Sequence, residues 1–104
     1  MSYQFAAVSA ASSGDNTLLV AQGTGLKIRV LGIVLVAAGA VTARLESGAG
    51  GTAMTGVMSL ITGVPLVIPL AEFGWTETAA NALLNLELGG AVQVSGTLVY
   101  AVVS

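Results

Sequence analysis

The side chains that could do acid–base or nucleophilic chemistry in this chain are few. It contains no histidine and no cysteine, which excludes a Ser–His–acid triad, thiolate chemistry and disulfides. A Ser–Lys pair would have to use Lys27, which alternates with Ile28 and neighbours Arg29 on the polar side of a predicted strand. A lysine in that setting is typically a solvent-facing or interface charge. We therefore expect no nucleophilic catalysis.

Paired carboxylates are the other common route to hydrolysis. The five acidic residues lie in different segments, and no local spacing brings two of them together; they are Asp15, Glu46, Glu72, Glu77 and Glu87. The pair Asp15-Asn16 offers too few oxygens for Ca²⁺, which takes about six to eight. The Gly48–Gly51 stretch lacks the Lys-Ser/Thr ending of a phosphate-binding loop. We expect no catalytic pair, no metal and no cofactor.

The composition indicates how much of the protein's surface is exposed to water. Only 8% of the residues are charged while 55% are apolar, against about 25% charged residues in an ordinary soluble domain. Part of the apolar excess is Ala and Gly, which add little hydrophobic area. The remaining Val, Leu and Ile exceed what one small domain of 104 residues buries. We expect much of the surface to be covered by other subunits.

The same composition argues against two classes of partner. The net charge is −2 and the basic residues number three, so there is no positive footprint for nucleic acid. The longest apolar run, Val30–Ala43, is shorter than the roughly 20 residues of a membrane helix and contains glycines. We expect no membrane partner. The N-terminus lacks the positive charge of a signal peptide, and we expect a complete gene product made in the cytoplasm.

Short segments of alternating or β-branched residues, separated by Gly and small polar clusters, predict an all-β domain. About eight strands over residues 1–104 favour a single-domain antiparallel sandwich, with a jelly roll as the preferred type and an Ig-like sandwich left open. The predicted strands are Tyr3–Ala11, Thr17–Gln22, Leu26–Val36, Ala40–Glu46, Ala53–Ile61, Leu66–Ile68, Ala82–Leu88 and Val92–Val103.

Several details of these strands can be predicted. Pro65 and Pro69 bracket an expected edge strand, because proline cannot donate to a ladder. Ala38-Gly39 and Gly89-Gly90 are predicted to form tight hairpin turns. Gly32 is a candidate bulge or close-packing site. The segment Ala71–Asn81 lacks β character and is expected to be a long loop with one helical turn.

Two groups of residues are candidates for contacts with partners. Ile33, Val34, Leu35 and Val36 are apolar on both faces of their strand, so both faces should be covered, by a second sheet or by a neighbouring subunit. The final strand, Val92–Val103, has a similar excess. Phe73 and Trp75 lie in the irregular segment and either plug the sandwich, which we favour, or anchor in a partner's pocket. Lys27, Arg29, Arg44 and Glu46 are expected to form a polar face toward solvent or a larger assembly.

The chain also resembles a known group of proteins. Gly14–Thr17, Lys27–Leu31, Pro69–Ala80, Ala82–Leu86 and Gly90–Tyr100 are similar to segments of small all-β structural proteins of tailed bacteriophages. Related segments occur in capsid decoration (cement) proteins and in appendage proteins. The resemblance implies a non-enzymatic virion protein on the capsid surface that forms a homo-oligomer, with a trimer as the expected form, and clamps the major capsid protein.

Two other functions remain open at this stage. A tail or appendage module would present loops of the same sandwich to a host receptor. A carbohydrate-binding sandwich would need exposed aromatic rings flanked by polar side chains, and only Trp75 with Glu72, Glu77 and Asn81 could supply them.

Overall fold

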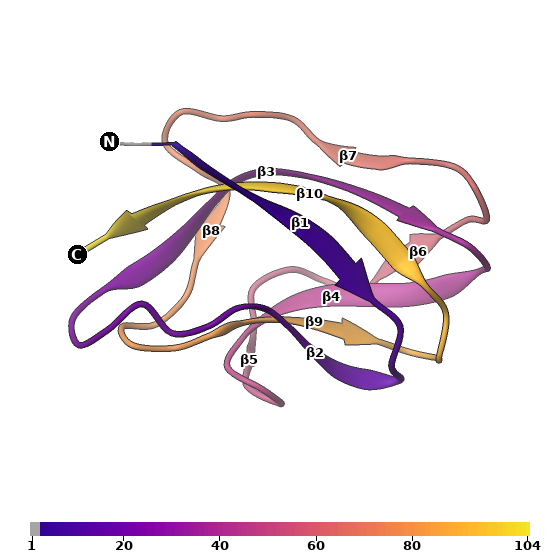
Figure 1. Cartoon of the computed structure of the whole chain (residues 1–104), viewed down its shortest axis with the longest axis horizontal. Coiled ribbons are helices and arrows are strands. Elements are labelled where there is room, and N and C mark those ends of the chain that lie inside the picture. The colour runs from indigo at the N-terminus through magenta and orange to yellow at the C-terminus, as the bar shows by residue number, and fades with distance from the viewer. Residues whose placement is uncertain (1–2) are drawn as a thin grey trace.

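Alternating apolar residues produce two antiparallel sheets that face each other (Figure 1). The computed structural model describes residues 3–104. Its ten strands are β1 (Gln4–Ala10), β2 (Gly14–Leu19), β3 (Lys27–Ala37), β4 (Val41–Ser47), β5 (Thr52–Ala53), β6 (Met58–Leu60), β7 (Leu66–Ile68), β8 (Thr76–Glu77), β9 (Leu84–Leu88) and β10 (Val94–Val103). No described segment is a helix, so none is a helix that could cross a membrane.

The strand order is that of a jelly roll. One sheet runs β1-β10-β3-β7, with β8 pairing the same edge of β3; the other runs β2-β9-β4-β5, with β6 also on β4. The pairs are nested, because β1 joins β10, β2 joins β9, β3 joins β7, and β4 joins β5. The predicted antiparallel sandwich is confirmed. Ten strands replace about eight because two of the edges are each formed by two short strands.

The predictions of two tight hairpin turns are both wrong. Ala38-Gly39 leads from β3 to β4 and Gly89-Gly90 leads from β9 to β10, and in each case the two strands belong to opposite sheets. Glycine-rich dipeptides predict that the chain reverses direction, but they do not decide whether it returns to the same sheet. In this topology the turns carry the chain across the core.

Two predicted segments are more broken than expected. The predicted strand Ala53–Ile61 is split into β5 and β6, separated by Met54–Val57. The predicted loop Ala71–Asn81 contains the short strand β8 on the edge of β3 and no helical turn. The predicted edge strand between the two prolines is confirmed as β7.

The core lies between the two sheets and is built from the inward side of each alternation. Leu84, Leu86 and Leu88 of β9 are all buried there, as are Val41, Ala43 and Leu45 of β4. The first sheet contributes the residues Val8, Ala10, Ile28, Val30, Ile33, Leu35, Ala37, Val94, Leu98 and Tyr100. Period-two alternation therefore predicted these faces correctly.

Gly32 lies in an irregular part of β3. Val99 pairs with Gly32 while Tyr100 pairs with Val30, which leaves Leu31 as an extra residue in a bulge. A Cβ at position 32 would lie 3.2 Å from the carbonyl oxygen of Ile68. Both properties predicted for this glycine, bulge and close packing, are present.

Gly32→Val is expected to lower the free energy of unfolding by about 1–3 kcal/mol, because overpacked side chains force their neighbours to shift. Denaturant titration followed by circular dichroism measures the loss. Gly56→Ala is the matched control, because a Cβ at position 56 would meet no atom within 4 Å. An unchanged denaturation midpoint for Gly32→Val would show that β7 can move away from β3 without a loss of stability.

Candidate self-association surface

The four residues Ile33–Val36 divide between the core and the surface. Ile33 and Leu35 point into the core, with exposed fractions of 2% and 0%. Val34, 38% exposed, and the half-buried Val36 lie on the outer side of the same strand. The second sheet is therefore the cover on one side. The prediction that Ile33 and Leu35 contact a partner is wrong, because both side chains are enclosed in the core of this fold.

An uncharged row crosses the outer face of the first sheet, while the charges of this face, Lys27, Arg29 and Glu77, lie toward one end of β3. Ala7, Thr97, Val34 and Val67 are paired in one row from β1 to β7. Phe5, which pairs with Val99 beside this row, is among the most exposed large apolar side chains of the described residues. This part of the sheet face has no charges that would favour permanent contact with water.

A second group of exposed apolar side chains lies in the segment that forms the edge strands β6, β7 and β8. Between positions 57 and 75 the chain exposes seven large apolar side chains, which we call the apolar edge: Val57, Ile61, Val64, Val67, Leu70, Phe73 and Trp75. The apolar edge meets the outer face at Val67, so the two surfaces are continuous. Exposed apolar surface on this scale marks protein–protein contact sites.

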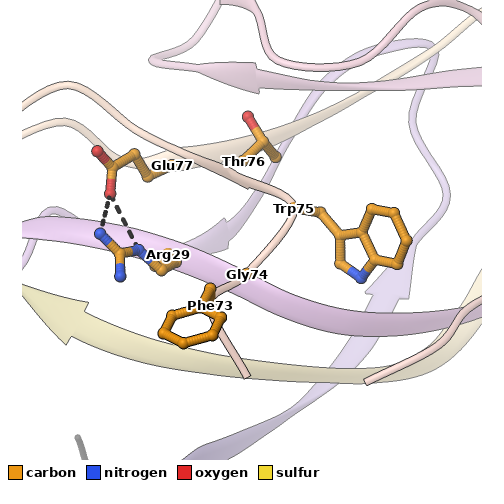
Figure 2. A pocket seen from close by; sticks show the side chains of 6 residues that line it. All are labelled: Arg29, Phe73, Gly74, Trp75, Thr76 and Glu77. Atoms are coloured by element: carbon orange, nitrogen blue, oxygen red, sulfur yellow. Dashed lines mark hydrogen bonds and ion pairs between the residues drawn. The ribbon is translucent and has the colours of Figure 1, made fainter. Parts of the chain in front are cut away.

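Phe73 and Trp75 do not plug the core. Their exposed fractions are 84% and 56%, so the favoured prediction for them is wrong and their alternative as contact residues stays a prediction. Figure 2 shows the two rings projecting in different directions from one loop. The indole Nε1 of Trp75 donates to the carbonyl oxygen of Pro69 at 2.7 Å, which closes the loop across its base.

The backbone of this loop is fixed to β3 at both ends. The N–H of Ala71 donates to the Leu31 carbonyl oxygen and the N–H of Trp75 to that of Val30, both at 2.9 Å. Gly74 adopts φ +81°, and a Cβ there would lie 2.6 Å from Cγ of Arg29. The loop therefore requires glycine at this position. It presents its apolar side chains on a preorganised frame, which lowers the entropy cost of binding.

An open hollow of about 420 Å³ lies beside the loop and is lined by Arg29 and residues 73–77. Its charges neutralise each other, because Nε and Nη2 of Arg29 donate to Glu77 Oε2 at 3.1 and 3.0 Å (Figure 2). Lys27 lies 3.9 Å from the same carboxylate. The polar groups next to Phe73 are thus engaged with one another.

The predicted polar face is not a single face. Lys27 and Arg29 lie on β3 of the first sheet, while Arg44 and Glu46 lie on β4 of the second. Glu46 is only 1% exposed, so its predicted place toward solvent or a larger assembly is wrong. Its carboxylate accepts a hydrogen bond from Nε of Arg44 at 2.7 Å and one from Nδ2 of Asn85 at 2.8 Å.

Three acids that no local spacing brings together converge on the outer side of the second sheet. Asp15, Glu46 and Glu87 each place a carboxylate oxygen within 4.8 Å of the others. Strand pairing causes this, because β2, β9 and β4 are neighbours and Glu87 is paired with both Asp15 and Arg44. Three oxygens are fewer than Ca²⁺ takes.

Asp15 and Glu87 share a proton-dependent contact. The hydrogen bond from Glu87 lowers the pKa of Asp15, helped by hydrogen bonds from Asn85 and the Gly50 N–H and opposed by burial. The same bond, burial and the negative charges of Asp15 and Glu46 raise the pKa of Glu87, against a smaller opposing effect of Arg44. Carboxyl groups in a glycosidase stand at least about 5 Å apart to admit a sugar. This pair is too close for that reaction.

The pair makes the stability of the fold depend on pH, and its two members contribute in opposite directions. The raised pKa of Glu87 contributes stability that is complete below its ordinary pKa of 4.5 and is lost as pH rises through its folded-state value. The lowered pKa of Asp15 contributes stability present above 3.8 and lost as pH falls through its folded-state value. Both contributions to stability are therefore present between pH 3.8 and pH 4.5.

Glu87→Gln is therefore expected to gain stability relative to the parent protein as pH rises from 4 to 7. The amide donates to Asp15 at every pH and adds no negative charge to the cluster. Thermal unfolding across this range measures the difference, and Glu72→Gln is the control at an exposed acid outside the cluster. Parallel pH profiles for parent and Glu87→Gln would contradict the shared contact.

The apolar edge was missed as a unit by the sequence predictions, although a signal for it exists. No charged residue lies between Glu46 and Glu72, and five of the seven residues of the apolar edge fall within this stretch. Individual apolar residues cannot be assigned to the surface from sequence, because the same types form the core.

Comparison of this chain with protein-family models and with curated proteins finds no match. What the chain does must therefore be inferred from its own surfaces.

Proposed function

We propose that this protein is a non-enzymatic structural protein of a virion, a capsid decoration protein that forms homo-oligomers on the head and stabilises contacts between major capsid subunits. The observation that carries the proposal is the apolar edge together with the uncharged row across the outer face of the first sheet. A chain that exposes this much apolar surface gains stability by burying it in a permanent interface, and obligate interfaces are the more apolar kind.

Two further observations support a structural role. Apart from Glu72, the charged side chains of the described residues are engaged in ion pairs or in the acidic cluster, with Arg29 on Glu77 and Arg44 on Glu46. The jelly roll is an architecture used by viral capsid proteins among others. Several copies clamped together bind a repeating lattice with avidity even when each single contact is weak. The resemblance to phage structural proteins points the same way.

Sedimentation of the purified protein tests the self-association. We expect a discrete oligomer at micromolar concentration, with three copies as the expected number. A stable monomer under these conditions would overturn the proposal.

Binding to separated phage parts tests the location. We expect the protein to bind mature heads and to leave tails unbound. Binding to tails alone would replace the decoration role with the alternative, a tail or appendage module. Glycan binding that disappears in Trp75→Ala, without loss of folding, would favour the carbohydrate-binding alternative, for which Trp75 and Glu77 are poorly placed because both already have partners.

A further inference from the structure

The apolar edge has two different ends. At one end the loop between β7 and β8 projects Leu70, Phe73 and Trp75 from a backbone fixed to β3. Phe73 is the most exposed large apolar side chain of the described residues. It has the properties of an interface anchor, because it is aromatic and held on a rigid loop.

At the other end the surface is hollowed. An apolar hollow of about 120 Å³ lies between β6 and β7 and is lined by Ser59, Leu60, Ile61, Val64, Pro65 and Leu66. Ile61 and Val64 on its rim are exposed. An apolar cavity of about 150 Å³ can hold a benzene molecule, so this hollow, which is open on one side, is of the right order of size for one aromatic ring. No charged residue lines it.

The loop and the hollow lie at opposite ends of the molecule. The loop is bonded to β3 at Val30 and Leu31, whereas the turn that follows the hollow's rim is bonded to β3 at Ala37. Figure 1 shows the loop after β7 running toward one end of the long axis and the β6–β7 connection at the other end. Because of this separation, the loop cannot contact the hollow of its own copy. Between copies they can meet head to tail, in a contact that repeats from one copy to the next.

We propose that the Phe73 loop of one copy seats in the β6–β7 hollow of the next copy, and that this contact, repeated, builds the homo-oligomer. The inference rests on the self-association in the proposed function and names its geometry. A second copy is the occupant that fits, since both halves of the contact are present on this chain, the hollow and Phe73 are both apolar, and no charge would be buried in the hollow. Head-to-tail contacts close into rings when the rotation between copies allows it.

Two variants that each damage one half of the contact test the geometry. Phe73→Ser removes the anchor, and Ile61→Ser makes the rim of the hollow polar; both positions are exposed, so both variants should fold. Each variant alone is expected to sediment as a monomer where the parent is an oligomer. Val20→Ser, at an exposed valine of similar exposure outside both surfaces, is the control and should assemble normally.

Mixing the two variants gives the decisive result. Phe73→Ser retains its hollow and Ile61→Ser retains its loop, so an equimolar mixture can form one intact contact and no more. We expect a heterodimer that does not grow larger. Normal assembly of either variant alone would overturn the head-to-tail contact while leaving the proposed function standing, whereas a monomeric parent protein would overturn both.

Cysteine cross-linking keeps the test valid if a single open contact is too weak to sediment as a dimer. The chain has no cysteine, so Glu72→Cys and Thr62→Cys, at exposed positions beside Phe73 and Ile61, each introduce one thiol next to an intact half of the contact. Oxidation of the mixed variants is expected to yield a disulfide-linked heterodimer, and oxidation of either variant alone to yield none. Homodimers of one variant would show that equivalent surfaces meet, which contradicts the inference.

Discussion

Leu35→Asp is expected not to fold, whereas Val34→Asp, one residue earlier on β3, is expected to fold with a loss of about 1 kcal/mol. Leu35 is fully buried between the sheets, while Val34 points outward. An unpaired carboxylate in the core costs several kcal/mol, and the substitution also loses about 1.5–3 kcal/mol of apolar burial. Together these losses are comparable with the total stability of about 5–15 kcal/mol of a typical domain.

Circular dichroism and denaturant titration of the two variants measure this contrast. Ile33→Asp should behave like Leu35→Asp, because Ile33 also lies in the core. Thr42→Asp is a further control at an exposed position of β4 and should be well tolerated. Equal tolerance of aspartate at positions 34 and 35 would show that the assignment of the two faces of β3 is wrong.

The alternation of side chains explains why the strands and their faces could be predicted. In Ala82–Leu88 the leucines at 84, 86 and 88 alternate with Asn85 and Glu87, and the structure buries the three leucines in the core. The period of two follows from the backbone geometry of an extended strand and needs no tertiary information. The two prolines around β7 predicted its edge position for a similarly local reason, the missing backbone donor.

The strand order could not be predicted in this way, and the errors in the predictions follow from it. Gly89-Gly90 predicts a reversal, but whether β10 returns beside β9 or crosses to the other sheet depends on contacts with residues distant in sequence. The acidic cluster has the same origin, since Asp15 and Glu87 are far apart along the chain and meet only through strand pairing. Asn85, which alternates with the core leucines of β9, is fully buried although it lies on the opposite side of the strand, because it joins this cluster.

The surface positions of Phe73 and Trp75 depend on backbone hydrogen bonds rather than on residue type. Aromatic residues in an irregular segment are often buried, and this favoured a plug. The donors at Ala71 and Trp75 instead fix the loop along the edge of β3, where its side chains face outward. The two aromatic rings that we predicted to be buried are therefore exposed, and exposed rings on a fixed loop are suited to contact another copy.

The ion pair between Arg44 and Glu46 is expected to matter more than an ordinary surface pair. Glu46 is buried, and its two carboxylate oxygens are each satisfied by one partner, Oε2 by Arg44 and Oε1 by Asn85. The side chain of Arg44 is 39% exposed, so water can replace part of what it supplies. Removing one partner of a fully buried pair costs about 3–5 kcal/mol, because the other charge stays buried and uncompensated.

We expect Arg44→Met to lower the free energy of unfolding by about 2–3 kcal/mol, below that range because of the exposure of Arg44. The double variant Arg44→Met/Glu46→Leu should recover much of this loss, since no unpaired carboxylate remains buried. The double-mutant cycle, completed by Glu46→Leu and measured by denaturant titration, isolates the coupling between the two side chains. A loss under about 1 kcal/mol for Arg44→Met, as for an exposed ion pair, would mean that Asn85 and water alone sustain the buried carboxylate.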